Sequence, residues 1–286
     1  QFFTTDIIQW FEERGVKLKA EQDGRMFPVT DSSQTIIDCL VREANKYGVE
    51  VKMRSEVSSM RSEGGLFNIE LSDFRHLTSD FACIASGGYP KSSMFEWLKQ
   101  LGHTIEEPAP SLFTFNLPKH PITRLMGVSA EEVRIKIAGT KLEQQGPILI
   151  THWGLSGPAI LRLSAWGAKL LKEKNWEFGV SINWLPHFSE QQLREKFKRM
   201  RSETASQKMT GKNPFGLPAR LWEFLAIQSG VKPGCRWADL PSAEQNRFVK
   251  NLYAYECDIK GKTTFKEEFV TAGGIRLSEV DANTMM

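Results

Sequence analysis

The 286-residue chain lacks the sequence patterns that bind nucleotide phosphates by themselves: neither G-x-G-x-x-G nor G-x-x-x-x-G-K-[ST] occurs in it. It also has no apolar run of the ~18 residues that a membrane-spanning helix needs, and no charged region followed by an apolar one at the N-terminus. Its cysteines, Cys39, Cys83, Cys235 and Cys257, show no C-x-x-C spacing. We therefore expect free thiols, three of them buried, no disulfide framework, no membrane partner and a cytoplasmic location.

The composition is that of a globular protein. Hydrophobic residues make up 41% of the chain, charged residues make up 25%, and the net charge is +3. At ~100–200 residues per domain, this length predicts two or three domains. So small a net charge neither requires nor excludes a polyanionic partner.

The first part of the chain predicts a mixture of helices and strands. Residues 31–47 have helical periodicity, with Asp31 as the expected cap and Gly48 as the end. Residues 49–53 and 66–71 alternate as strands do. The run at residues 81–85 is apolar throughout, which is typical of a strand buried on both faces of a parallel sheet, with a ligand crevice beyond its end at Ser86-Gly87-Gly88.

Prolines after residue 107 predict a domain boundary near residue 110. Short strands over residues 111–150 predict a small antiparallel sheet or barrel, followed by a helix capped by Ser156 and a strand at 178–184. Residues 189–256 carry helical signals, including a capping box at Ser189. A last strand at 265–270 is expected to run into Gly273-Gly274. The fold class is thus α/β, or α+β overall, with boundaries at 1–110, 111–188, 189–260 and 261–286.

Two double glycines are candidate ligand contacts. Gly87-Gly88 and Gly273-Gly274 each follow an expected strand, and glycine allows a backbone to approach a ligand without collision of a β-carbon. Each pair also fits an ordinary tight turn. From the residues alone, both interpretations stay open.

Arg25 and His152 are candidate binding groups. Arg25 stands in Gly24-Arg25-Met26-Phe27-Pro28, and its guanidinium could hold a carboxylate or phosphate. His152 belongs to the segment Thr151-His152-Trp153-Gly154-Leu155-Ser156-Gly157-Pro158, which predicts a polar turn before a helix. The alternatives are a surface arginine and a histidine that only packs. No histidine has cysteines or carboxylates at metal-ligand spacing, so we expect no metal.

Residues 194–212 are rich in Lys and Arg and could bind nucleic-acid phosphates. Glu195 and Glu203 interrupt the run, and Phe197 is its only aromatic residue. The pattern favours a solvated helix face over a nucleic-acid partner.

Five segments in order resemble one family: Gly24 to Pro28, Ala85 to Gly88, Leu101-Gly102-His103-Thr104-Ile105, Thr151 to Pro158, and Val270-Thr271-Ala272-Gly273-Gly274-Ile275. This is the family of NAD(P)/FAD-dependent oxidoreductases that includes aminoacetone oxidase and BaiN-like bile-acid reductases. The resemblance spans nearly the whole chain. It implies a split, Rossmann-like FAD-binding domain with an inserted β-sheet or barrel region and a helical subdomain, and it identifies the chain as a core fragment without the Gly-rich terminal motifs.

The resemblance also implies roles for particular residues. Val57 would lie near the adenine of FAD, and Ser86, Gly87, Gly88, Gly273 and Gly274 near the dinucleotide. Arg25, His152, Gly154, Ser156 and Gly157 would line the cavity that faces the flavin or substrate. No catalytic residue is assigned, because flavin itself carries the redox step.

Two hypotheses follow. In the first, the parent protein is a flavin-dependent oxidoreductase that transfers hydride between a small organic substrate and FAD, with NAD(P) a possible second cofactor, and this chain alone lacks FAD and activity. In the second, the chain is a non-enzymatic binding module whose basic region, 194–212, contacts nucleic acid or a protein. Neither the substrate, nor oxidase versus reductase activity, nor the oligomeric state follows from these motifs.

Overall fold

A computed structural model describes residues 2–21, 24–89, 91–211, 213–263 and 270–285. The fold is mixed α/β, with a barrel-like sheet and several helices, which confirms the predicted class. The chain forms two compact units. The first unit comprises residues 1–84, 97–103 and 277–286, and the second comprises 85–96 and 104–276. Each is described below by itself.

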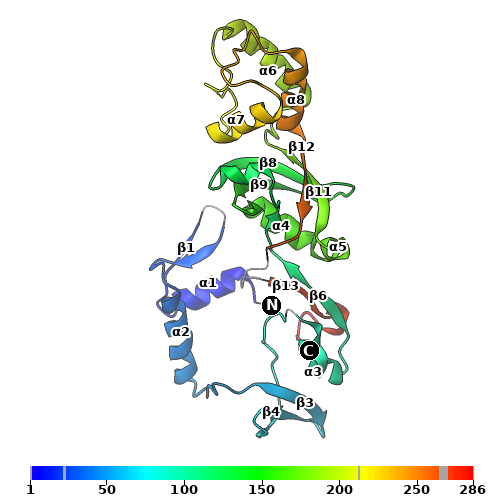
Figure 1. Cartoon of the computed structure of the whole chain (residues 1–286). Helices are drawn as coiled ribbons and strands as arrows, with labels where there is room; N and C mark the ends of the chain where they lie inside the picture. Colours follow the sequence, from blue (N-terminus) through cyan, green and yellow to red (C-terminus); the bar gives the residue numbers. More distant parts are fainter. Residues whose placement is uncertain (1, 22–23, 90, 212, 264–269, 286) are drawn as a thin grey trace. The chain divides into compact units, whose positions relative to one another are not determined.

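The first unit holds a β1–β2 hairpin and a three-stranded antiparallel sheet in the order β3-β4-β5 (Figure 1). The Gly64-Gly65 turn joins β3 to β4, and β4 confirms the predicted strand at residues 66–71. The elements of this unit are α1 (Thr4–Glu12), β1 (Leu18–Ala20), β2 (Met26–Pro28), α2 (Ser33–Lys46), β3 (Val57–Glu63), β4 (Leu66–Leu71), β5 (His76–Ser79), α3 (Glu96–Gln100, whose first residue belongs to the second unit) and the 3-10 helix η3 (Leu277–Glu279).

Helix α2 confirms the predicted helix but differs in its cap and in its burial. Ser32 caps it, because its hydroxyl accepts the N–H of Gln34 (3.3 Å), whereas Asp31 lies just outside with φ = 54°. The apolar side chains that give the helix its periodicity are not buried. Instead Ile37, Leu40 and Val41 are 49%, 48% and 52% exposed, respectively.

Two predicted strands are wrong. Residues 49–53 and 81–85 have no strand structure, and both stretches are largely exposed, with Met53 at 79% and Phe81 at 83%. A strand needs a neighbour to take up its backbone N–H and C=O groups. In the part of the chain that the structure describes, neither stretch has such a neighbour.

The second unit is built around a six-stranded antiparallel sheet in the order β12-β11-β8-β9-β10-β7 (Figure 1). Its elements are the 3-10 helix η1 (Ser92–Phe95), β6 (Ile105–Ser111), β7 (Phe115–Asn116), the 3-10 helix η2 (Pro121–Leu125), β8 (Ser129–Ile137), β9 (Glu143–Ile150), β10 (Gly154–Ser156), α4 (Pro158–Trp166), α5 (Ala168–Glu173), β11 (Glu177–Asn183), α6 (Glu190–Glu203), α7 (Ala219–Gln228), α8 (Ser242–Tyr253), β12 (Tyr255–Lys260) and β13 (Val270–Ile275).

The two edges of this sheet meet, which gives it a barrel-like form. Phe115 of β7 forms a bridge with Lys262, just beyond β12, and the N–H of Asn116 donates to the carbonyl of Gly261 (3.1 Å). Strict alternation in β8 turns Val133, Ile135 and Ile137 inward, and all three are fully buried. The predicted antiparallel sheet or barrel is therefore confirmed.

Helices α6, α7 and α8 form a group between β11 and β12 in the chain (Figure 1). The predicted capping box begins α6: Ser189 Oγ accepts the N–H of Gln192 (3.2 Å), and the Gln192 side chain accepts the N–H of Ser189 (2.8 Å). Phe197, Trp222 and Phe248 fill the space among the three helices, and their rings contact one another. This aromatic core is continuous with that of the sheet.

Strands β6 and β13 pair antiparallel, although β6 contains Pro108 and Pro110, where no regular structure was expected. Proline is tolerated in an edge strand because that strand has one side without ladder hydrogen bonds. The predicted strand at residues 265–270 falls mostly on 264–269, outside the described residues. None of the helices in the described part of the chain has the length and apolarity that crossing a lipid bilayer demands.

Candidate functional site

The two double-glycine segments lie together in the second unit. Gly88 packs against β13: a β-carbon built on Gly88 would stand 3.3 Å from Cβ of Thr271 and 3.6 Å from its carbonyl oxygen. Thr271 is two residues before Gly273. The structure thus brings together the two motifs that sequence placed on separate strands.

The surroundings of Gly87 fit the close approach of an anionic ligand. Its φ is +73°, and a β-carbon built there would meet nothing else within 4 Å among the described residues. Ser86, Gly87 and Gly88 are exposed, and no described residue accepts a hydrogen bond from the N–H of Gly87 or Gly88. Exposed backbone donors beside a glycine are the groups that a dinucleotide phosphate can use.

Gly273 and Gly274 take part in strand pairing. They do not follow a strand; they lie within β13, at a bulge between Ala272 and Gly274. A β-carbon on Gly273 would stand 2.8 Å from the carbonyl oxygens of Glu106 and Glu107. Gly273 is therefore required by the β6–β13 pairing itself.

The segment from Thr151 to Pro158 forms a corner of the barrel-like sheet. A tight turn at 151–153 links β9 to β10, and Thr151 Oγ1 accepts the N–H of Gly154 (3.1 Å). A β-carbon would stand 2.0 Å from the Phe115 carbonyl oxygen at Gly154, and 2.8 Å from the Pro147 carbonyl oxygen at Gly157. At both glycines, the chain's own backbone thus occupies the space that a side chain would need.

Within this corner, His152 is exposed and its ring contacts Trp153 edge to face, with centroids 4.1 Å apart. The Trp153 indole donates to Thr114 Oγ1 (3.1 Å). Ser156 was expected to cap the next helix; instead it ends β10, and Gly157 is the N-cap of α4, with no side-chain cap. At this corner, the His152 side chain is thus exposed to solvent, whereas Trp153, Gly154 and Gly157 make contacts that stabilise the fold.

Arg25 and Val57 belong to the first unit. The Arg25 guanidinium lies 5.5 Å from the centroid of the Phe27 ring, in the β1–β2 hairpin. Val57 begins β3, where it pairs with Leu71 and remains partly exposed.

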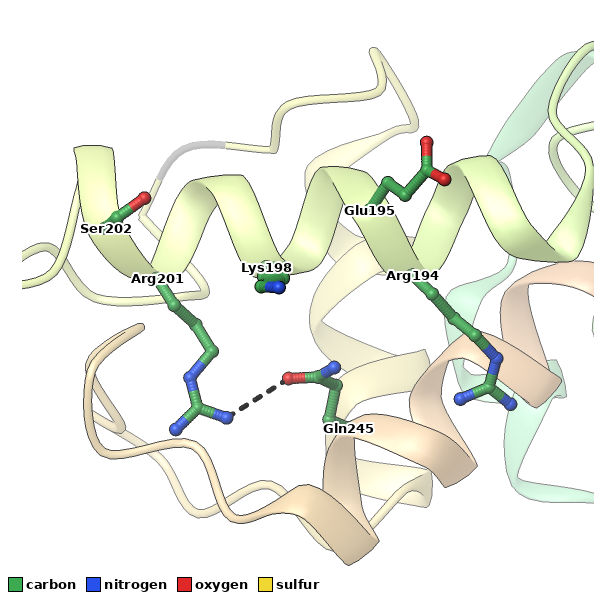
Figure 2. A pocket seen from close by; sticks show the side chains of 6 residues that line it. All are labelled: Arg194, Glu195, Lys198, Arg201, Ser202 and Gln245. Carbon is green, nitrogen blue, oxygen red and sulfur yellow. Dashed lines mark hydrogen bonds between the residues drawn. The ribbon is translucent and has the colours of Figure 1, made fainter.

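A basic groove lies between α6 and α8 (Figure 2). The hollow has a volume of about 540 Å³ and is lined by Arg194, Glu195, Lys198, Arg201, Ser202 and Gln245. Arg201 donates to Gln245 Oε1 (3.3 Å) and Arg194 to Asn246 Oδ1 (2.5 Å). Arg194 also lines an adjoining hollow of about 500 Å³ with Glu190, Asn246, Arg247, Lys250, Tyr253 and Ala254. We call the two hollows together the α6–α8 groove.

Half of the α6–α8 groove was not foreseen from the basic run at 194–212. Its α8 side comes from about fifty residues farther along the chain, and only folding brings the two helices together. Phe197, the aromatic residue within the run, is fully buried, whereas Tyr253 of α8 lines the groove. Lys212 lies outside the described residues.

A smaller hollow of about 270 Å³ lies beside the barrel-like sheet, lined in part by Glu132, Trp184, His187, Phe215 and Pro218. The Trp184 indole is 1% exposed, and its N–H has no acceptor among the described residues. The ring of His187 contacts the carboxylate of Glu132.

Comparison with known proteins finds a family model and several relatives that match this chain. A family model described as "HI0933-like protein barrel and H2TH domain" matches residues 109–270, more than half of the chain. The "Ribosomal RNA dihydrouridine synthase" of Escherichia coli (strain K12) is 27% identical, over 100% of this chain and 70% of its own length. The protein of that name from Haemophilus influenzae is 24% identical, over 98% and 69%.

The "3-dehydro-bile acid delta(4,6)-reductase" of Clostridium scindens is 25% identical, over 100% of this chain and 71% of its own length. The matched residues include the barrel-like sheet and the helix group described above. The chain therefore belongs to the HI0933-like family of FAD-dependent oxidoreductases.

Proposed function

We propose that the protein is an FAD-dependent reductase that adds two hydrogens across a C=C bond conjugated to a carbonyl group. This chemistry is common to the names of its relatives. Dihydrouridine is uridine with two hydrogens added to the pyrimidine C=C bond beside a carbonyl, and a 3-dehydro delta(4,6) steroid has C=C bonds conjugated to its ketone. Two substrates of different size would thus share one reaction.

The reaction consists of a hydride, which carries the electron pair, and a proton. Reduced FAD, when bound, supplies the hydride. The hydride adds to the carbon far from the carbonyl, the negative charge is delocalised onto the carbonyl oxygen, and a proton adds to the nearer carbon. NAD(P)H is the proposed source of electrons for the flavin.

The observation that carries the flavin proposal is the contact of Gly88 with β13, beside the open backbone at Gly87. In the proposed site, the N–H groups of Gly87 and Gly88 hold a phosphate of FAD, and Ser86 lies at its edge. Gly273 and Gly274 shape the supporting strand. A role for Val57 at the adenine, and for Arg25 and His152 toward the flavin, remains part of the proposal.

The exposed apolar face of α2 supports a split FAD-binding domain. Ile37, Leu40 and Val41 together form an apolar stripe, and exposed stripes of this kind mark a surface that another element covers. We propose that further chain of the same protein packs there. The proposed domain limits are those expected from the sequence, with residues 1–110 and 261–286 on the FAD-binding side of the insertion.

A matched pair of glycines tests the flavin site. Gly87 and Gly139 have φ values of +73° and +72°, and a β-carbon on either would meet nothing within 4 Å. Gly87→Ala and Gly139→Ala thus impose the same backbone cost. In the full-length protein we expect Gly87→Ala to lower the bound FAD, measured by visible absorbance, while Gly139→Ala leaves it unchanged. Equal FAD content in both variants would contradict a role for Gly87.

The reaction itself is tested by anaerobic turnover of the FAD-loaded full-length protein with NAD(P)H. The two substrates are a conjugated 3-oxo steroid and an RNA transcript containing uridine, and mass spectrometry detects the gain of two hydrogens. Reduction of neither substrate, with FAD bound and reduced by NAD(P)H, would overturn the proposed reaction.

A further inference from the structure

We propose that the α6–α8 groove binds the sugar–phosphate backbone of an RNA substrate and so holds the RNA for reduction of a uridine. This inference rests on the proposed reductase function and names its substrate class. It concerns a surface made entirely within the second unit.

The charge of the groove fits a polyanion. Five cationic side chains line it, against two carboxylates: Arg194, Lys198, Arg201, Arg247 and Lys250, against Glu190 and Glu195. Two of the cations also have carboxylate partners beyond the lining, Glu244 for Arg247 (2.8 Å) and Glu256 for Lys250 (3.4 Å). Glu190 is paired with Arg194 (2.6 Å), and Figure 2 shows Glu195 on the side of α6 away from Gln245. Lys198 makes no hydrogen bond or ion pair with any described residue. Its ammonium is thus available to a phosphate.

Three of the cations form a row along α6. Arg194, Lys198 and Arg201 follow one face of α6, and Figure 2 shows Arg194 and Arg201 on the same side as Gln245. Seven residues of helix rise by roughly 10 Å. Because an RNA strand carries a phosphate at each nucleotide, a row of this length can contact more than one phosphate.

The α8 side supplies the other contacts that RNA uses. Gln245 and Asn246 present amides that can donate to phosphate or ribose oxygens, and the Tyr253 ring, 38% exposed, can stack on a base. The printed substrate of two relatives is ribosomal RNA. A bile acid has one carboxylate at most, whereas an RNA strand offers a phosphate at each nucleotide along the groove.

The test uses two doubly substituted full-length proteins that each lose two positive charges. Lys198→Ala/Lys250→Ala removes cations from the groove. Lys196→Ala/Arg199→Ala removes them from α6 outside the residues that line the groove. The probe is a fluorescently labelled RNA stem–loop, and the affinity is measured by anisotropy between about 50 and 200 mM salt.

We expect the groove variant to bind more weakly and its slope of log affinity against log salt to shrink by about 0.7–0.9 for each lost phosphate contact. The matched variant should retain the affinity and slope of the unsubstituted protein. Identical slopes in both variants, or an unsubstituted protein that binds a bile acid but no RNA, would overturn the inference.

Reduction of a small conjugated enone separates this inference from the proposed reaction. The groove variant should reduce the enone at the rate of the unsubstituted protein while losing activity on RNA. Failure of the unsubstituted protein on the enone and on RNA would count against the reaction. Groove-dependent RNA binding would then still be decided by the salt slopes.

Discussion

Gly88 lies directly against Thr271: a β-carbon on Gly88 would stand 3.3 Å from Cβ of Thr271, a tighter contact than most side chains make. The segment at Gly88, before the barrel-like sheet in the chain, is therefore in contact with β13, which follows that sheet. The two double-glycine motifs, both expected near the dinucleotide, are close to each other because of this contact.

This contact predicts coupling between the two positions. Gly88→Ala should lower the free energy of unfolding by about 1 kcal/mol, because β13 must move to admit the methyl group. In a Thr271→Gly background, where the opposing β-carbon is gone, the same substitution should cost less. Denaturant unfolding of the four proteins measures the coupling, and an unchanged cost in both backgrounds would contradict the contact.

Gly154 predicts a large steric effect. Alanine there would place its β-carbon 2.0 Å from the Phe115 carbonyl oxygen, whereas at Gly146 the nearest atoms are 3.9 Å away, and φ is similar at +157° and +146°. We expect Gly154→Ala to destabilise by roughly 3 kcal/mol or more and Gly146→Ala by about 1 kcal/mol. Thermal unfolding compares them, and equal losses would show that the backbone at Phe115 yields freely.

Two buried tryptophans should differ in how much stability is lost when the indole N–H is removed. Trp222 donates to the Met209 carbonyl (2.8 Å), while the Trp184 N–H has no acceptor among the described residues. Both substitutions to Phe remove similar volume, so Trp222→Phe should cost about 1 kcal/mol more than Trp184→Phe. Chemical denaturation measures the difference. A greater loss for Trp184→Phe would indicate an unrecognised acceptor at its ring.

His120 predicts a loss of stability in mild acid. Its Nδ1 accepts the N–H of Ile122 (3.2 Å), and burial lowers its pKa below the ordinary 6.5. The unfolded chain therefore takes up a proton first as pH falls below 6.5, and the contribution of neutral His120 to folding is lost toward its lowered folded-state pKa. His120→Asn keeps a capping acceptor without a titration, so its unfolding temperature should fall less than that of the unsubstituted protein between neutral and mildly acidic pH. Parallel pH profiles for the two proteins would show that His120 does not contribute.

The cysteines predict selective alkylation. Two thiols are buried, Cys39 and Cys257, rather than the three expected, and burial raises the pKa of Cys257 to about 12. Burial also raises the pKa of half-buried Cys235, whereas Cys83 is exposed. Because the thiolate is the reactive form, iodoacetamide should label Cys83 first under native conditions. Peptide mass spectrometry identifies the site, and earlier labelling of Cys257 would contradict its burial.

Sequence patterns predicted elements whose signals are local. The helical signals at residues 189–256 correspond in part to α6 and α8, because α6 contains its own capping box and each of the two helices has its own apolar face. The strands predicted at residues 49–53 and 81–85 are absent. Alternation or apolarity describes only one of the two strands that must pair. In both cases the partner strand decides, and one segment does not specify it.

The candidate site shows the same limit. Glycines were correctly identified as special, but the chemistry that makes them so differs: Gly154, Gly157 and Gly273 admit the chain's own carbonyl groups, while Gly87 alone of these opens to solvent. Sequence cannot distinguish these uses, since both need the same missing β-carbon. Likewise, the run at 194–212 gave the charges of the α6–α8 groove but not its opposite wall on α8.

The pairing of Ser111 with Val270 makes the end of β6 and the start of β13 next-door neighbours. The chain between them therefore starts and ends at the same place. If it were removed, a short linker could join the end of β6 to the start of β13 with little cost in loop-closure entropy.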